Sequence, residues 1–213
     1  SDIAKKHDML TVVDNTFMTP YYQNPLDLGA DIVLHSATKY LGGHSDVVSG
    51  LIVTANESLG DRIGFIQNST GGILGPQDSY LLTRGIKTLG LRVEQINRNV
   101  KEVVALLNKH ENVVKTIHPL NEDHVNRDIH FEQASGYPGI ISFEVADVEK
   151  AKEVIKHTKL FTLAESLGAV ESLISVPSLM THASIPAEIR HKEGIADGMI
   201  RVSIGREDTK DLV

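Results

Sequence analysis

Short apolar runs alternate with turns and helix-like stretches throughout the first half of the chain. Residues 10–13, 32–35 and 51–54 have the length and the β-branched content of buried strands, and residues 25–30 and 57–69 have helical patterns. Residues 14–25 are rich in turn formers. This alternation favours an α/β fold, in which a mostly parallel sheet is covered by helices.

The second half of the chain has a different pattern. Apolar residues recur at helical spacing from 77 to 109, which predicts a long amphipathic helix broken near Gly85 or Gly90. Residues 113–117, 140–145, 173–176 and 199–204 read as strands, 148–157 and 186–193 as helices, and 121–137 as a loop or short surface helix. We therefore predict two domains, with residues 1–93 as the C-terminal part of a large domain and residues 94–213 as a smaller α+β domain.

Composition excludes several classes of function. The chain has 213 residues, a formal charge of −7 and no block rich in Lys and Arg, so we expect no nucleic-acid partner. No apolar run approaches the roughly 20 residues that span a bilayer, and the first residues lack a secretory apolar core, which predicts a cytoplasmic protein. The absence of cysteine excludes disulfides and thiolate chemistry, and the ten histidines have no compact metal-binding spacing.

Polar residues follow two of the predicted strands. Lys39 lies in the run Ser36 to Tyr40 straight after one strand, and Asp14 closes the strand before it. The carboxyl ends of strands in an open α/β sheet are where ligands bind. An amine, hydroxyls and a carboxylate are the groups that pyridoxal phosphate requires, but a solvated lysine and a turn aspartate explain the same residues taken singly.

The segments around these residues form a larger pattern. DNTF at 14–17, TPYYQNPL at 19–26, LGAD at 28–31 and SATKYLGGHSDVVSG at 36–50 resemble the Cys/Met-metabolism family of pyridoxal phosphate enzymes. The resemblance continues through RGIKTL at 84–89, AESLGAVESL at 164–173, MTHAS at 180–184 and IRVSIG at 200–205. It implies an aspartate-aminotransferase-like subunit of fold type I, with this chain as its C-terminal part.

The resemblance assigns roles to four residues near the cofactor, which would be pyridoxal 5'-phosphate. Lys39 would bind it covalently and then act as acid and base. Asp14 would pair with the protonated pyridine nitrogen, and the hydroxyls of Ser36 and Thr38 would bind the phosphate.

The resemblance also implies a substrate site. Arg201 would bind the α-carboxylate of an amino-acid substrate, because a guanidinium makes two parallel bonds to a carboxylate. Ser166 and Glu165 would line the same pocket, although both also fit an ordinary polar pair of a loop. The glycine-rich segment at 71–76 fits no phosphate-binding pattern, so we expect a turn there.

The chain is short for the family and opens inside a helical pattern, so we expect an N-terminal segment to be absent. In the family that segment contributes to cofactor binding and to the site of a neighbouring subunit, usually within a homotetramer. The expected reaction is γ-elimination of cystathionine to cysteine, 2-oxobutanoate and ammonia. Two alternatives stay open, γ-replacement on an acyl-homoserine with cysteine and an inactive, truncated subunit with a role in assembly.

Overall fold

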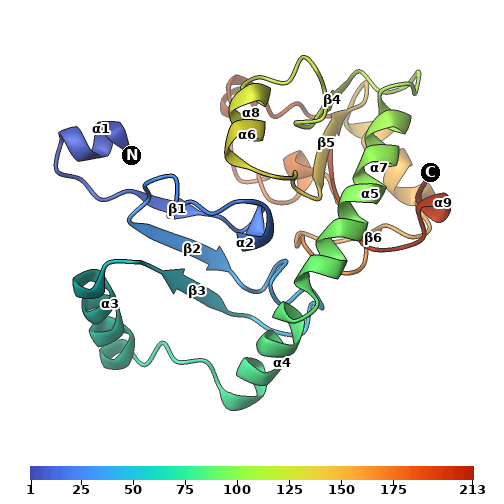
Figure 1. The fold of residues 1–213 in the computed structure, drawn as a ribbon. Coiled ribbons are helices and arrows are strands. Elements are labelled where there is room, and N and C mark those ends of the chain that lie inside the picture. Colours follow the sequence, from blue (N-terminus) through green and yellow to red (C-terminus); the bar gives the residue numbers. More distant parts are fainter. The chain divides into compact units, whose positions relative to one another are not determined.

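The chain forms two compact units in a computed structural model that describes residues 1–213 (Figure 1). Unit 1 comprises residues 1–90 and a short return segment, residues 131–136, and unit 2 comprises residues 91–130 and 137–213. The return segment is held to unit 1 by the backbone N–H of Ser135, which donates to the carbonyl of Tyr22 at 2.9 Å. The assignment of a cofactor domain to 1–93 and a smaller domain to 94–213 stays a prediction.

Unit 1 contains a three-stranded sheet in the order β1-β2-β3. Strand β1 (Val12–Asp14) runs parallel to β2 (Ile32–Ser36), with Asp14 opposite Leu34, and β3 (Gly50–Val53) runs antiparallel to β2. Strand β3 is thus the antiparallel member of a sheet that the sequence predicts to be mostly parallel. Residues 37–49 connect β2 to β3 without a helix, whereas the crossover between parallel neighbours usually contains one.

The helices of unit 1 are α1 (Asp2–Lys6), α2 (Thr19–Tyr22), α3 (Glu57–Thr70) and α4 (Pro76–Ile86). Helix α3 begins where the side chain of Asn56 accepts a hydrogen bond from the backbone N–H of Leu59 and ends at Gly71, which has a φ of 74°. The predicted helix at 25–30 is wrong. A single turn forms there, because Gly29 with a φ of 89° ends it.

Unit 2 contains a five-stranded sheet in the order β4-β5-β8-β7-β6. Its strands are β4 (Lys115–Ile117), β5 (Ile140–Glu144), β6 (Thr162–Leu163), β7 (Leu173–Ser175) and β8 (Met199–Ser203). All pairings are antiparallel except β6 with β7. The two residues of β6 are too few to leave a periodic signal, which is why this strand was not predicted.

Helix α5 (Leu89–Leu107) carries the predicted apolar stripe of unit 2, and the break before it lies after Gly85 as expected. Val93, Ile96, Val100 and Val104 on this stripe are buried. The other helices are α6 (Arg127–Gln133), α7 (Val148–His157), α8 (Ala187–Lys192), α9 (Thr209–Leu212) and the 3-10 turn Pro177–Leu179. None of these helices has the length and apolar composition that crossing a bilayer requires.

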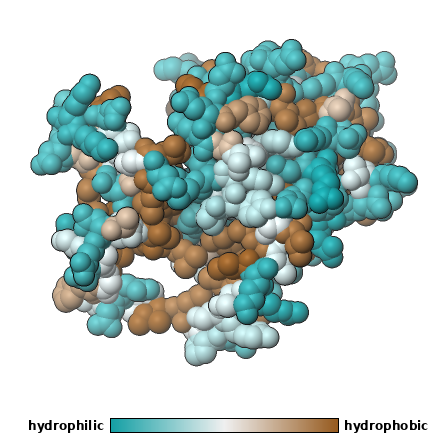
Figure 2. Space-filling view, viewed as in Figure 1, coloured by the Kyte–Doolittle hydropathy of each residue, from teal (hydrophilic) through white to brown (hydrophobic).

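Unit 1 exposes more apolar surface than its small sheet can bury. Val12 and Ile52 on the strands, Phe65 and Ile66 on α3, and Ile73 after it are all at least half exposed. Figure 2 shows this hydrophobic surface in brown along the strands and at the turn from α3 to α4. Apolar surface of this extent is unusual on a soluble monomer and is typical of an interaction surface.

Two helical glycines provide a matched test of this packing. A Cβ at Gly85 would overlap the carbonyl oxygen of Gly42 and lie 2.8 Å from that of Leu41, whereas a Cβ at Gly64 would meet nothing within 4 Å. We expect Gly85→Ala to lower the free energy of unfolding by about 1–3 kcal/mol, because backbone must move. Gly64→Ala should raise it by about 0.5–1 kcal/mol, because alanine is the better helix former. Urea unfolding measures both, and equal effects would contradict the close approach of α4 to Gly42.

Candidate active site

A cavity of about 430 Å³ lies at the carboxyl ends of β1 and β2 in unit 1. It is lined by eight residues, Asp14, Asn15, Thr16, Phe17, Met18, Gln23, Ser36 and Lys39. Parallel pairing puts the ends of both strands at the same edge of the sheet, so the carboxylate of β1 and the hydroxyl and amine that follow β2 surround one space. Three of the predicted cofactor residues, Asp14, Ser36 and Lys39, are thus brought together.

Hydrogen bonds fix the two strand ends to each other. The Thr16 hydroxyl accepts a bond from the backbone N–H of Ser36 at 2.8 Å and donates to Oδ1 of Asp14, which also accepts the backbone N–H of Thr16 at 3.0 Å. Thr16 is 8% exposed. A single buried hydroxyl therefore sets the position of the Asp14 carboxylate relative to the start of the turn that carries Lys39.

Lys39 follows β2 in a tight turn. Its backbone N–H donates to the carbonyl of Ser36 at 3.1 Å, and the N–H of Gly43 donates to the carbonyl of Lys39 at 2.7 Å. Gly43 has a φ of 75°, a conformation that other residues rarely adopt. The backbone of Lys39 is thus bonded on both sides, while its half-buried side chain lines the cavity.

Thr38 does not line the cavity. Its hydroxyl accepts the backbone N–H of Ser49 at 3.0 Å and donates to the Ser49 carbonyl at 3.3 Å. The second bond is long for an O–H donor, whose usual distance is about 2.7–2.8 Å, so a phosphate oxygen would be a stronger acceptor. The role of Thr38 as a phosphate ligand stays a prediction.

His35 on β2 is buried beside this site. Burial lowers the pKa of its imidazole, and the negative charge of Asp14 opposes that shift. Its Nδ1 has no hydrogen-bond partner although it is shielded from solvent. Burial therefore favours the neutral form of His35 beside the carboxylate.

The predicted substrate residues lie in unit 2. Arg201 is on the central strand β8, and its guanidinium Nη2 donates to the backbone carbonyl of Glu165 at 2.8 Å. Burial lowers the pKa of Arg201, and the Glu165 carboxylate raises it by a smaller amount. Ser166 is half-buried in the loop that follows Glu165. The structure thus brings Arg201 and the 165–166 segment together, within unit 2.

Several residues of the unit 1 cavity had no predicted role. Thr16, Phe17 and Gln23 line it, and the first two belong to the segment DNTF that marks the family. The signal for Thr16 was present, since a hydroxyl two residues after a strand-end aspartate is placed to bond its carboxylate. No group of three or more His, Asp and Glu side chains in residues 1–213 could hold a metal ion.

Comparison with known proteins identifies the family. A sequence model of the Cys/Met metabolism PLP-dependent enzymes matches residues 1–213, the whole of this chain. The chain belongs to this family. Its relatives include a cystathionine gamma-lyase of Bacillus subtilis (strain 168), 58% identical over 213 residues, and a cystathionine beta-lyase of Lactococcus lactis subsp. cremoris (strain MG1363), 55% identical over the same length.

Solved structures of family members have the same α/β fold. A cystathionine gamma-lyase from Lactobacillus plantarum complexed with L-serine matches 99% of this chain and 55% of its own, with a TM-score of 0.94 and 48% identity. A cystathionine gamma synthase from Xanthomonas oryzae pv. oryzae in complex with aminoacrylate and cysteine matches with a TM-score of 0.95 and 43% identity. The matches to the Bacillus and Lactococcus relatives cover all of this chain but only 56% of each relative. The chain therefore spans about half their length.

The family's cofactor is pyridoxal phosphate, and the residues of the unit 1 cavity fit it. Asp14 would supply a carboxylate for a pyridinium nitrogen, Ser36 a hydroxyl for the phosphate and Lys39 a primary amine. The lowered pKa of His35 disfavours a second positive charge beside the Asp14 carboxylate.

Thr16 provides a test of this cavity. We expect Thr16→Val to weaken binding of pyridoxal phosphate by about 5-fold to 100-fold, because the Ser36 N–H loses its partner, at about 1–3 kcal/mol, and the hydroxyl no longer positions the Asp14 carboxylate. Thr16→Ser keeps the hydroxyl and should bind nearly as tightly as the natural chain. Titration of the visible absorbance band gives both affinities, and equal weakening by the two variants would contradict the role of the hydroxyl.

Proposed function

We propose that this chain forms part of a trans-sulfuration enzyme that cleaves cystathionine by γ-elimination. Water and cystathionine give cysteine, 2-oxobutanoate and ammonia. The observation that carries the proposal is the cavity in which Asp14, Ser36 and Lys39 meet, in a chain of a PLP-dependent family.

Asp14 and Ser36 hold the cofactor in this proposal. Bound pyridoxal phosphate supplies an electron sink for the electrons that remain when a proton leaves the substrate Cα. Asp14 keeps a positive charge on the ring nitrogen by pairing with it, and the Thr16 hydroxyl holds the carboxylate in place. The Ser36 hydroxyl, and that of Thr38 once it leaves the Ser49 carbonyl, bind the phosphate.

Lys39 is the proposed catalytic residue. Lys39 would bind the cofactor covalently until the substrate takes its place. The free amine of Lys39 would then take the proton from the substrate Cα and move protons among the substrate carbons and the cofactor. The hydrogen bonds on both sides of its backbone keep the base of the side chain fixed while the amine moves.

Arg201 is the proposed site for the substrate α-carboxylate. One of its five N–H groups donates to the Glu165 carbonyl, which orients the guanidinium. The other four N–H groups can donate to other partners. Ser166 and Glu165 belong to the loop that Arg201 contacts, and we propose that they line the substrate pocket.

The choice of γ-elimination rests on the segment Glu165 to Leu167, which carries no bulky aromatic residue, and on the absence of tryptophan from the whole chain. Relatives named cystathionine gamma-lyase support it. Gamma-replacement with cysteine is a second candidate, supported by the match to a cystathionine gamma synthase, and β-elimination is a third, supported by a relative named cystathionine beta-lyase at 55% identity.

We further propose a cytoplasmic homotetramer whose sites are completed by residues outside this chain. The exposed apolar surface of unit 1 supports such an assembly, because residues such as Phe65 and Ile66 on α3 need cover. A subunit with an assembly role alone would share this surface but would not need the cavity around Lys39.

Covalent labelling tests the cofactor site. After incubation with pyridoxal phosphate and reduction with borohydride, we expect mass mapping to find the cofactor on Lys39. Lys39→Ala should abolish the visible band and the label, whereas Lys87→Ala, at an exposed lysine of unit 1, should change neither. Specific label elsewhere with none on Lys39, in this chain and in longer forms of the protein, would reject the site.

Arg201→Lys tests the substrate site. We expect KM for cystathionine to rise about 10-fold or more with a smaller change in kcat, because lysine cannot form the paired bonds to a carboxylate. Arg206→Lys is the control, since Arg206 is an exposed arginine near the same strand. Unchanged KM in Arg201→Lys would reject the assignment.

Product analysis decides among the three reactions. With cystathionine as substrate, γ-elimination releases cysteine and 2-oxobutanoate, whereas β-elimination releases homocysteine and pyruvate. With acyl-homoserine and cysteine, only γ-replacement forms cystathionine. Faster turnover of the second pair than of cystathionine would overturn the preference for γ-elimination.

A further inference from the structure

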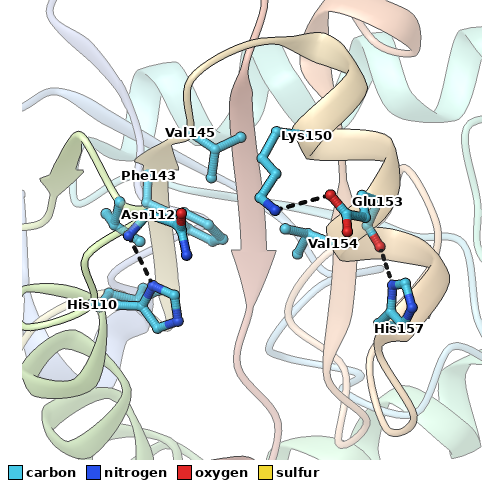
Figure 3. Close-up of a pocket in the computed structure, with 10 residues that line it drawn as sticks. His110, Asn112, Phe143, Val145, Lys150, Glu153, Val154 and His157 are labelled. Carbon is cyan, nitrogen blue, oxygen red and sulfur yellow. Dashed lines mark hydrogen bonds and ion pairs between the residues drawn. The ribbon is translucent and has the colours of Figure 1, made fainter.

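A second cavity lies entirely within unit 2, and none of the site residues assigned above lines it (Figure 3). Its volume is about 290 Å³, at the lower end of the roughly 300–1,000 Å³ of small-molecule pockets. It is bordered by the end of α5, the segment that follows it, strand β5 and helix α7. The cavity therefore depends on elements whose arrangement is set within one unit.

The floor and walls of this cavity are apolar. Phe143 and Val145 are buried beneath it, and Leu107, Val113 and Val154 supply aliphatic surface around them. A hydrocarbon group placed there would leave water at a gain of roughly 25 cal/mol for each Å² covered. The floor thus favours a ligand with an apolar body of a few carbon atoms.

Two histidines at the rim offer opposite hydrogen-bonding groups. Nδ1 of His110 accepts the backbone N–H of Asn112 at 3.2 Å, so the neutral ring carries its proton on Nε2 and can donate. Nδ1 of His157 lies 2.8 Å from the carbonyl of Glu153 and must donate to it, so Nε2 of the neutral ring can accept. Figure 3 shows the two rings on opposite sides of the cavity.

A salt bridge adds one charge of each sign. Lys150 Nζ lies 2.9 Å from Glu153 Oε2, and their side chains are 37% and 55% exposed. The hydrogen bond to Lys150 and the charge of Lys150 lower the pKa of the Glu153 carboxyl, which favours its ionised form. Exposed pairs of this kind are held weakly, so either partner can turn to a ligand.

We propose that this cavity binds a free α-amino acid with an apolar side chain. The side chain lies on Phe143 and Val145, the α-carboxylate faces Lys150 and the Nε2–H of His110, and the α-ammonium faces Glu153 and Nε2 of His157. The carboxylate of a simple carboxylic acid would be repelled by Glu153, and the ammonium of a simple amine would be repelled by Lys150. A zwitterion offers a group of opposite charge to each of these two side chains. The site is separate from the proposed catalytic residues and does not depend on the proposed function.

Calorimetric titration of L-leucine into the PLP-loaded protein tests the site. An Arg201→Ala background removes the proposed catalytic carboxylate site, and an unchanged visible spectrum shows that leucine has not reacted with the cofactor. We expect one binding event per chain in this background. Hexanoate and 3-methylbutylamine, which each carry half of the zwitterion, should bind at least 10-fold more weakly.

Variants of α7 provide the control. Lys150→Ala with Glu153→Ala should weaken leucine binding at least 10-fold, and Val154→Trp should abolish it by filling the cavity. Lys152 and Glu149 form a bridge of the same spacing on the same helix, at 2.6 Å, but do not line the cavity. Their double alanine variant should bind leucine as the background does. No binding in the Arg201→Ala background, or equal loss in both double variants, would overturn the proposal.

Discussion

The parallel pairing of β1 with β2 determines where the chemistry of unit 1 can occur. Parallel strands end at the same edge of a sheet, and Asp14 opposite Leu34 sets the register so that Asp14 and Ser36 both lie at that edge. The buried hydroxyl of Thr16 then bonds to both residues and fixes their separation. The turn that starts at Ser36 places Lys39 at the same cavity, so the position of Lys39 depends on the pairing of the two strands.

Most long elements of the fold could be predicted from periodicity. Helix α5 shows its apolar stripe in the sequence, and the predicted break near Gly85 lies between the end of α4 at Ile86 and the start of α5 at Leu89. The features that could not be predicted lie where tertiary pairing overrides local pattern. The direction of β3 depends on the connection before it, and a glycine with positive φ ends the turn at 25–30 before a helix can form.

The candidate site could be predicted in part. A strand-end position and the motif around Lys39 pointed to Asp14, Ser36 and Lys39, which do line one cavity. The hydrogen bonds of Thr38 to Ser49 could not be foreseen, because they depend on how the loop at 37–49 folds back. The link through Thr16 needed the distance between two strand ends, which residue types alone do not give. The position of the Arg201 guanidinium likewise depends on the loop at Glu165.

The return segment at 131–136 has a consequence for the modularity of the chain. Because unit 1 contains residues 1–90 and these later residues, the polypeptide crosses between the units at three points. No single cut separates them, and a fragment that stops at Gly90 would leave the carbonyl of Tyr22 without the N–H of Ser135. Recombination at a single point in the gene therefore could not exchange either unit as a whole. Unit 1 is complete only when residues 1–90 and 131–136 are both present.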